Sequence, residues 1–149
     1  MTRYLEDIKI GERMEFGRYE VTEQEIIEFA SKYDPQKIHT DPAFAAESDM
    51  GGLIASGWHT SAMFMRMMVD EIMGQDTGMV SPGVDDLKWM RPVRPGDVLR
   101  VRGEIVAARP SRSKPDRGIV QTRYEVLNQN DDVVMSVKTN SFIRRRAAG

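Results

Sequence analysis

Two residues whose types and spacing could perform chemistry are Asp34 and His39, which lie close together in the sequence with Pro35 between them. If the two side chains meet, the carboxylate and the imidazole can hold a water molecule between them. The carboxylate can then act as general base, while the imidazole orients the water or delivers a proton. The alternative from spacing alone is an ordinary helix-ending turn without a catalytic role.

A second segment, Gly51 to Thr60, holds the other histidine and a glycine at the expected start of a long helix. Because the first amides of a helix have no intrahelical partner, the Gly57 N–H is predicted to face an incoming carbonyl oxygen. Such a donor stabilises negative charge that develops on a thioester or ester oxygen in enolate-like chemistry. Gly52 would let a ligand approach the backbone closely, although glycines also mark simple turns.

Local signals place the first acidic group at the end of a helix. Thr22 and Glu25 have the spacing of a capping box, which predicts a helix from about Glu23 to Tyr33. Pro35 ends that helix, so Asp34 is expected at its exit on irregular backbone. The negative end of the helix dipole would oppose ionisation of this carboxylate, unless nearby hydrogen-bond donors reverse the effect.

The second segment leads into a long apolar helix. Asp41 followed by Pro42 predicts a short helix, and Ser56 is expected to cap a helix from about Gly57 to Met73. That helix is apolar on nearly every face, which predicts burial. Its methionines are interpreted mainly as core filler, although their flexibility would also suit a tunnel for an acyl chain. His59 is interpreted as a packed or capping residue rather than a ligand or a second base.

The second half of the chain has the pattern of strands. Four β-branched, often alternating segments follow Gly74, and one earlier segment from Met14 to Val21 is also strand-like. We therefore predict an α+β fold in which a curved antiparallel sheet wraps around the long central helix. A lone sheet leaves an edge uncovered, so we expect a homodimer or a larger homo-oligomer. The four later segments are Val84–Met90, Val98–Ala108, Gly118–Asn128 and Val133–Ile143.

Length and composition restrict the classes of partner. The 149 residues are expected to form a single domain, residues 1–149. With 21 basic and 23 acidic residues, no global field recruits nucleic acid or an anionic membrane. The chain has no cysteine, no signal-like start and no apolar run long enough for a membrane span, so a cytoplasmic location is expected. The histidines and aspartates match no compact metal-ligand motif, and no metal is expected.

At these residues the sequence resembles the MaoC-like family, the (R)-specific enoyl-CoA hydratases and related acyl dehydratases of fatty acid metabolism. Asp34, Ile38, His39 and Asp41 match the first part of the family motif, and residues 54–57 match the second. Gln36 and Lys37 replace the usual Asn and Pro, which marks a place where substrate choice can differ. The similarity extends over essentially the whole chain.

The resemblance implies a hot-dog fold and reversible hydration of a trans-2-enoyl thioester to an (R)-3-hydroxyacyl thioester. Catalysis would involve Asp34, His39 and the Gly57 N–H, and the expected substrate is an acyl-CoA. No separate cofactor is expected, because coenzyme A is part of that substrate. The alternatives are a hot-dog acyl-CoA thioesterase and a non-catalytic acyl-CoA binding module. The residues expected to contact the substrate are Gln36, Ile38, Gly52, Ser56 and Met63.

Overall fold

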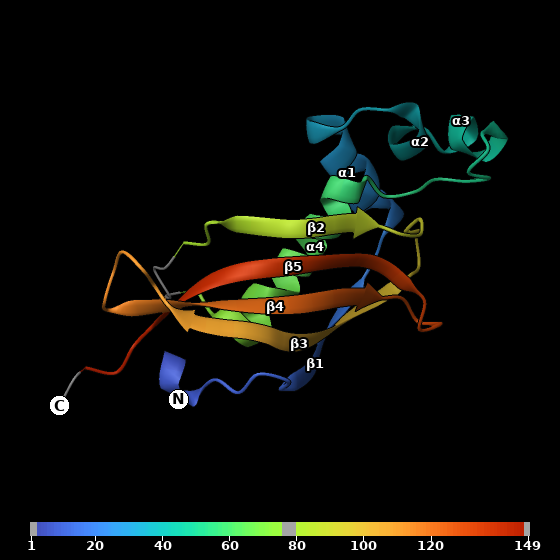
Figure 1. Ribbon diagram of the computed structural model, residues 1–149. Helices are drawn as coiled ribbons and strands as arrows, with labels where there is room; N and C mark the ends of the chain where they lie inside the picture. Colours follow the sequence, from blue (N-terminus) through green and yellow to red (C-terminus); the bar gives the residue numbers. More distant parts are fainter. Residues whose placement is uncertain (1–2, 76–79, 148–149) are drawn as a thin grey trace.

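The fold is a five-stranded antiparallel sheet with helices on one face, seen in a computed structural model that describes residues 3–75 and 80–147 (Figure 1). The strand order is β1-β3-β4-β5-β2, so β1 and β2 form the two edges. Each neighbouring pair of strands is antiparallel. The strands are β1 (Arg13–Glu20), β2 (Gly83–Trp89), β3 (Val98–Pro110), β4 (Arg117–Leu127) and β5 (Val133–Arg144). The strand prediction is therefore confirmed, with shifts of one or two residues at the ends.

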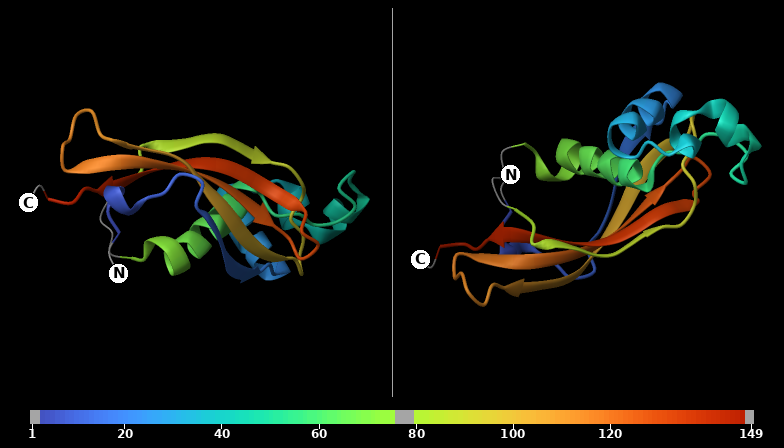
Figure 2. Two further views of the ribbon diagram at one scale, coloured as in Figure 1. Left: turned by 60° about the horizontal axis from the view of Figure 1, so that its bottom comes forward. Right: turned by 90° about the horizontal axis from the view of Figure 1, so that it is seen from above.

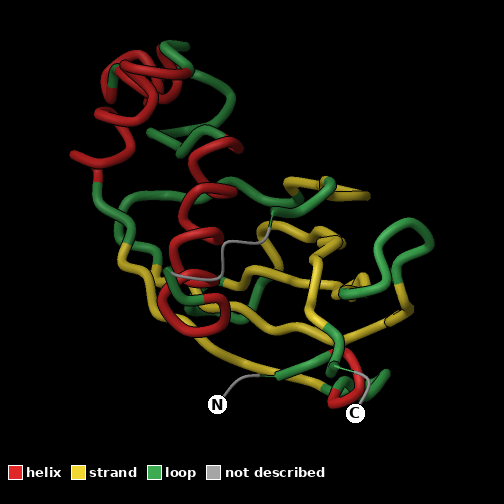
Figure 3. Tube along the Cα trace, turned by 90° about the vertical axis from the view of Figure 1, so that its left-hand side faces the viewer, coloured by secondary structure: helices red, strands yellow, loops and turns green. Residues whose placement is uncertain are grey.

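The long helix α4 (Gly57–Met68) lies along one face of the curved sheet (Figure 2). Three shorter helices gather at the end of α4 where its first turn lies (Figure 3). They are α1 (Glu23–Tyr33), α2 (Lys37–Thr40) and α3 (Pro42–Glu47). The core lies between α4 and the sheet, and its buried side chains include Met63, Phe64, Met67, Leu99, Val101, Val126 and Val134.

Two of the predicted helices form as expected. The α1 helix has the predicted bounds, and the Thr22 side chain accepts a hydrogen bond from the Glu25 N–H. The other half of the capping box is absent because the Glu25 carboxylate bonds elsewhere. Asp41 caps α3 by accepting a hydrogen bond from the Phe44 N–H.

Two short helical turns were not anticipated from the sequence. The α2 helix and η1 (Leu5–Asp7) are each about one turn long, too short to produce a helical periodicity. The predicted helix to Met73 also changes character near its end, because α4 stops at Met68 and η2 (Val69–Met73) continues as a π-helix. Because it belongs to α2, His39 lies on a helical turn.

The prediction that the central helix is buried on all sides is also wrong. Met63, Met67 and Met68 are buried against the sheet, but Trp58 is 59% exposed and Met65 is 45% exposed. The sheet covers one face of α4 and leaves the opposite apolar face open. Within the described parts of the chain, no helix is long and apolar enough to cross a membrane.

Candidate active site

Asp34 ends α1 and receives hydrogen bonds on both carboxylate oxygens. It occupies the C-cap position, as expected from Pro35. The Gln36 side-chain amide donates to Oδ1 at 2.7 Å, and the Ser56 hydroxyl donates to Oδ2 at 2.7 Å. The carboxylate is thus held by one neighbour in the sequence and by one residue from the start of α4.

His39 lies on α2 with its ring buried against the segment that leads to α4. Its Nδ1 lies 2.7 Å from the backbone oxygen of Ile54, and the Ile54 N–H donates to the oxygen of Ile38 at 3.2 Å. A carbonyl oxygen can only accept, so Nδ1 carries the proton of this bond. In the neutral ring Nε2 is then a free acceptor, and it lies 3.5 Å from Oδ2 of Asp34.

Gly57 begins α4, and its N–H has no hydrogen-bond partner within residues 3–75 and 80–147. The preceding residue, Ser56, occupies the N-cap position but makes no side-chain cap, because its hydroxyl serves Asp34. The expectation that Ser56 caps the helix is therefore wrong in its chemistry. This N–H at the start of a helix can donate a hydrogen bond to a ligand oxygen on which negative charge develops.

A cavity of about 250 Å³ brings His39 and Gly57 to one site. Trp89 and Thr60 line it too, and the Trp89 indole N–H donates to Ser61 on α4. Trp89 could not be selected from its residue type or spacing, because its place beside Gly57 depends on how the end of β2 meets α4. The remaining lining residues are Ile54, Ala55, Met90, Arg91, Pro92 and Val93.

The other predicted substrate-contacting residues occupy different surroundings. Gln36 and Ser56 bind Asp34 directly. Ile38 pairs through its backbone with Ile54, and Gly52 lies near the Arg94 guanidinium, but neither lines the cavity beside His39. Met63 lines a separate cavity with His59, so it does not join this site. Direct contacts of these residues with substrate remain predictions.

Hydrogen bonding sets the acidity of Asp34. The donors from Gln36 and then Ser56 lower the pKa of Asp34, and this outweighs the opposite effect of partial burial. The helix C-terminus was expected to oppose ionisation unless nearby donors reversed the effect, and the pKa is lowered by two such donors. Because the pKa is lowered on folding, the ionised carboxylate favours the folded state above its unfolded pKa. This contribution is lost as the pH falls through the folded pKa.

Replacing Ser56 by Ala is expected to raise the pKa of Asp34, because one of its two donors is lost while Gln36 remains. A carbon-13 NMR titration of the side-chain carboxyl groups measures this shift. Asp116 is an internal control, because Arg117 rather than a serine lowers its pKa. An unchanged or lower pKa of Asp34 in the Ser56→Ala variant would contradict the assignment of Ser56 as a donor that lowers this pKa.

In the described parts of the chain, no group of at least three histidine, aspartate or glutamate side chains lies where it could hold a metal ion. The groups that the described residues bring to this site are the Asp34 carboxylate, the His39 imidazole and the Gly57 amide. A base, a second proton-accepting nitrogen and an amide donor suit water addition beside a carbonyl group.

Comparison with known proteins places the chain in a family. The model of the MaoC like domain matches residues 7–130. A crystal structure of a MaoC-like dehydratase from Rhodospirillum rubrum has a TM-score of 0.89 at 39% identity, covering 98% of this chain and 99% of that one.

Two curated relatives are more distant in sequence. The uncharacterized protein YdeM of Bacillus subtilis is 26% identical over 141 residues, 95% of this chain and 99% of that protein. The 3-hydroxybutyryl-CoA dehydratase of Methylorubrum extorquens is 28% identical over 112 residues, 74% of this chain and 69% of that protein. With its curved sheet, its central helix and its match over residues 7–130, the chain belongs to the MaoC-like dehydratase domain family and has the hot-dog fold.

Proposed function

We propose that this protein is an acyl-CoA hydratase/dehydratase, which adds water reversibly to a trans-2-enoyl thioester and gives an (R)-3-hydroxyacyl thioester. The observation that carries the proposal is the pairing of Asp34 Oδ2 with His39 Nε2 at 3.5 Å. His39 also lines the same cavity as Gly57, whose N–H has no hydrogen-bond partner among the described residues. Membership of a family of dehydratases supports this reading.

The pair is arranged to bind and activate one water molecule. An ionised carboxylate and the Nε2 lone pair are both acceptors, so they face each other without a proton to share. A water placed against both would donate one O–H to Asp34 and the other to His39. Its own lone pair would then be directed at the substrate, and transfer of a proton to Asp34 would generate the attacking oxygen.

In this reaction one water molecule supplies both the hydroxyl group that bonds to C3 and the proton that bonds to C2. The hydroxyl of water bonds to C3 of the enoyl group, and the electrons of the C2–C3 double bond move toward the thioester oxygen. The Gly57 N–H would stabilise the negative charge on that oxygen, a contribution of about 3 kcal/mol for one such donor. The proton taken from water then returns to C2 from the Asp34 and His39 pair, and dehydration is the reverse sequence.

Replacing Gly57 by Ala is expected to lower kcat/KM for crotonyl-CoA hydration by about 10²-fold, because a displacement of the donor or the substrate by 1 Å can cost that much. The added methyl group would lie 2.5 Å from the Trp89 ring, so the indole must move within the site. Steady-state kinetics of the variant measure the loss. If the cause is this clash, Gly57→Ala combined with Trp89→Leu recovers activity toward that of Trp89→Leu alone. An unaffected Gly57→Ala variant would contradict the expected displacement of groups in the site by the clash with the Trp89 ring.

The hydration proposal is tested by supplying trans-2-enoyl-CoA substrates and following loss of the enoyl group. The same reactions, assayed for free thiol, separate hydration from the thioesterase alternative. Binding of enoyl-CoA and saturated acyl-CoA without any product, measured by mass spectrometry, would instead support the non-catalytic binding module.

We also propose that the working form is a homodimer or a larger homo-oligomer. Among the residues that the structure describes, the edge strand β2 pairs with β5 alone. Val84 and Trp89 on β2, Met90 just after it, and Trp58 and Met65 on α4 are exposed apolar side chains. A second copy would cover them and remove apolar surface from water. Sedimentation equilibrium should give at least twice the chain mass of 16.9 kDa, and a monomer at all concentrations would contradict this.

A further inference from the structure

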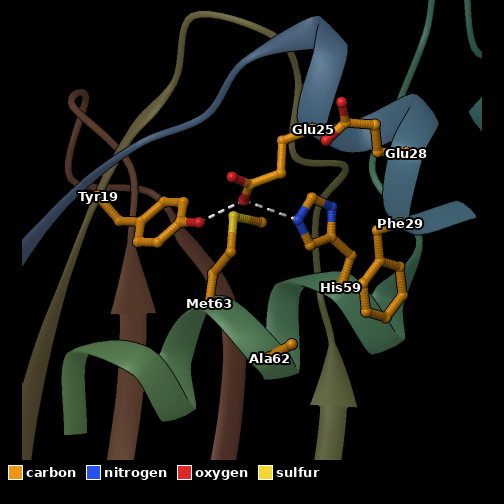
Figure 4. A pocket seen from close by; sticks show the side chains of 7 residues that line it. All are labelled: Tyr19, Glu25, Glu28, Phe29, His59, Ala62 and Met63. Carbon is orange, nitrogen blue, oxygen red and sulfur yellow. Dashed lines mark hydrogen bonds and ion pairs between the residues drawn. The ribbon is translucent and has the colours of Figure 1, made fainter. Parts of the chain in front are cut away.

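A second polar cluster lies beside the first turn of α4, outside the cavity that His39 lines. His59 Nε2 lies 3.1 Å from Glu25 Oε1, and the Tyr19 hydroxyl donates to the same carboxylate oxygen (Figure 4). The Phe29 ring stacks on the His59 ring with centroids 4.6 Å apart and planes 10° from parallel. These side chains, with Glu28, Ala62 and Met63, line a cavity of about 330 Å³.

The histidine in this cluster is not explained by packing alone. His59 is only 3% exposed, and its Nδ1 is buried without a partner among the described residues. Because Glu25 accepts from Nε2, Nδ1 of the neutral ring remains as an unpaired acceptor. A buried acceptor without a partner costs free energy that an aliphatic side chain would avoid. The histidine adds something an aliphatic residue cannot, which is a directional bond to Glu25.

That bond joins the two helices that hold Asp34 and Gly57, two of the three proposed catalytic residues. Glu25 lies in the first turn of α1, the helix that ends at Asp34. His59 lies in the first turn of α4, two residues after Gly57. The hydrogen bond from Ser56 to Asp34 joins the same two helices at a second point. These two separate hydrogen bonds restrict how far α4 can slide or rotate against α1.

We propose that Glu25 and His59 are positioning residues, and that their bond, braced by Tyr19 and Phe29, sets the place of the Gly57 N–H relative to Asp34 and His39. This inference rests on the proposed function and deepens it. Since the pair lies outside the cavity beside His39, its loss should affect kcat more than KM. A displacement of a reacting group by about 1 Å can lower a rate by about 10²-fold.

The test compares variants that break the bond with variants that keep it. His59→Leu and Glu25→Leu should each lower kcat for crotonyl-CoA hydration by about tenfold or more while KM stays within about twofold. His59→Gln places an amide nitrogen near the position of Nε2 and should retain most of the activity. Glu28→Leu is the matched control, since Glu28 lies on the same helix, lines the same cavity and bonds Gln24 instead.

Coupling and an NMR signal separate positioning from a general loss of stability. The double variant Glu25→Leu, His59→Leu should be no slower than His59→Leu alone, because both changes remove one interaction. The Gly57 amide resonance should shift in both single leucine variants and stay in place in Glu28→Leu. This signal needs no turnover, so it reports on positioning even if the wild-type protein hydrates no enoyl thioester, which would overturn only the proposed function.

Three results would overturn the positioning role. The first is wild-type kcat and an unmoved Gly57 resonance in both leucine variants. The second is additive loss in the double variant, and the third is a change in KM without a change in kcat. If His59→Leu does not fold, Glu25→Leu and His59→Gln decide the question by the same kinetics and the same resonance.

Discussion

Asp34→Asn is expected to lower kcat/KM for crotonyl-CoA hydration by about 10³-fold, within the range of about 10²–10⁴-fold that a positioned general base contributes. Asparagine has nearly the same shape as aspartate and can still accept a hydrogen bond from Ser56 or Gln36, but it cannot take a proton from water at neutral pH. Steady-state kinetics with purified variant and wild-type protein measure the loss, and thermal unfolding shows whether the fold is retained.

Asp41→Asn is the control for the loss of an aspartate in the same region. Asp41 caps α3 through its side chain, and asparagine is an equally good N-cap. This variant should therefore have wild-type kinetics and stability. Equal losses in Asp34→Asn and Asp41→Asn would remove Asp34 from the chemistry.

His39→Asn should have a comparable effect, a loss of about 10²-fold or more, because it removes the nitrogen that faces Asp34. The asparagine amide nitrogen lies near the position of Nδ1, so the hydrogen bond to the Ile54 oxygen can be kept. What the variant lacks is an acceptor at the position of Nε2, 3.5 Å from Asp34. The same kinetic assay applies, and the Ile54 carbonyl resonance checks that the bond persists.

The result of the His39→Asn experiment separates a chemical role from a structural one. Loss of activity with an unchanged Ile54 resonance and unchanged thermal stability would support His39 as a member of the water-activating pair. Near-wild-type activity would contradict that role and leave Asp34 as the single proton acceptor of the proposed mechanism.

Much of the fold could be predicted from local sequence. The Thr22 cap, Pro35 and the alternating second half were enough to place α1, its exit at Asp34 and the four later strands. Burial of α4 was predicted less well, because residue type says which side chains are apolar and not which face the sheet reaches. Trp58 and Met65 are apolar and yet lie on the face of α4 that the sheet does not cover.

The helices that hold Asp34 and Gly57 were predicted, but the short helix α2, which carries His39, and the hydrogen bonds to Asp34 were not. Gln36 stood out as a departure from the family pattern and an expected substrate contact, whereas it donates to Asp34 and is the largest cause of its lowered pKa. Ser56 was expected to cap α4 and instead serves the same carboxylate. Which donor reaches which acceptor depends on how α1 and α4 pack. The distance between two side chains on different helices cannot be read from their spacing in the sequence.

The hydrogen bonds around His59 were likewise not predicted from the sequence. The sequence correctly predicted that His59 is packed rather than a member of the first acid/base pair. Its partner Glu25 was expected to complete the cap of α1, and Tyr19 had no assigned role. The three meet because β1, α1 and α4 converge at one end of the sheet.

The central claim is tested most directly by incubating the purified wild-type protein with a panel of trans-2-enoyl-CoA substrates of different chain lengths and resolving the hydroxyacyl products by chirality. The account predicts hydration of at least one of them to the (R)-3-hydroxyacyl-CoA, with activity near background in the parallel Asp34→Asn reaction. No hydration at any chain length, or equal rates for wild-type and Asp34→Asn protein, would contradict it.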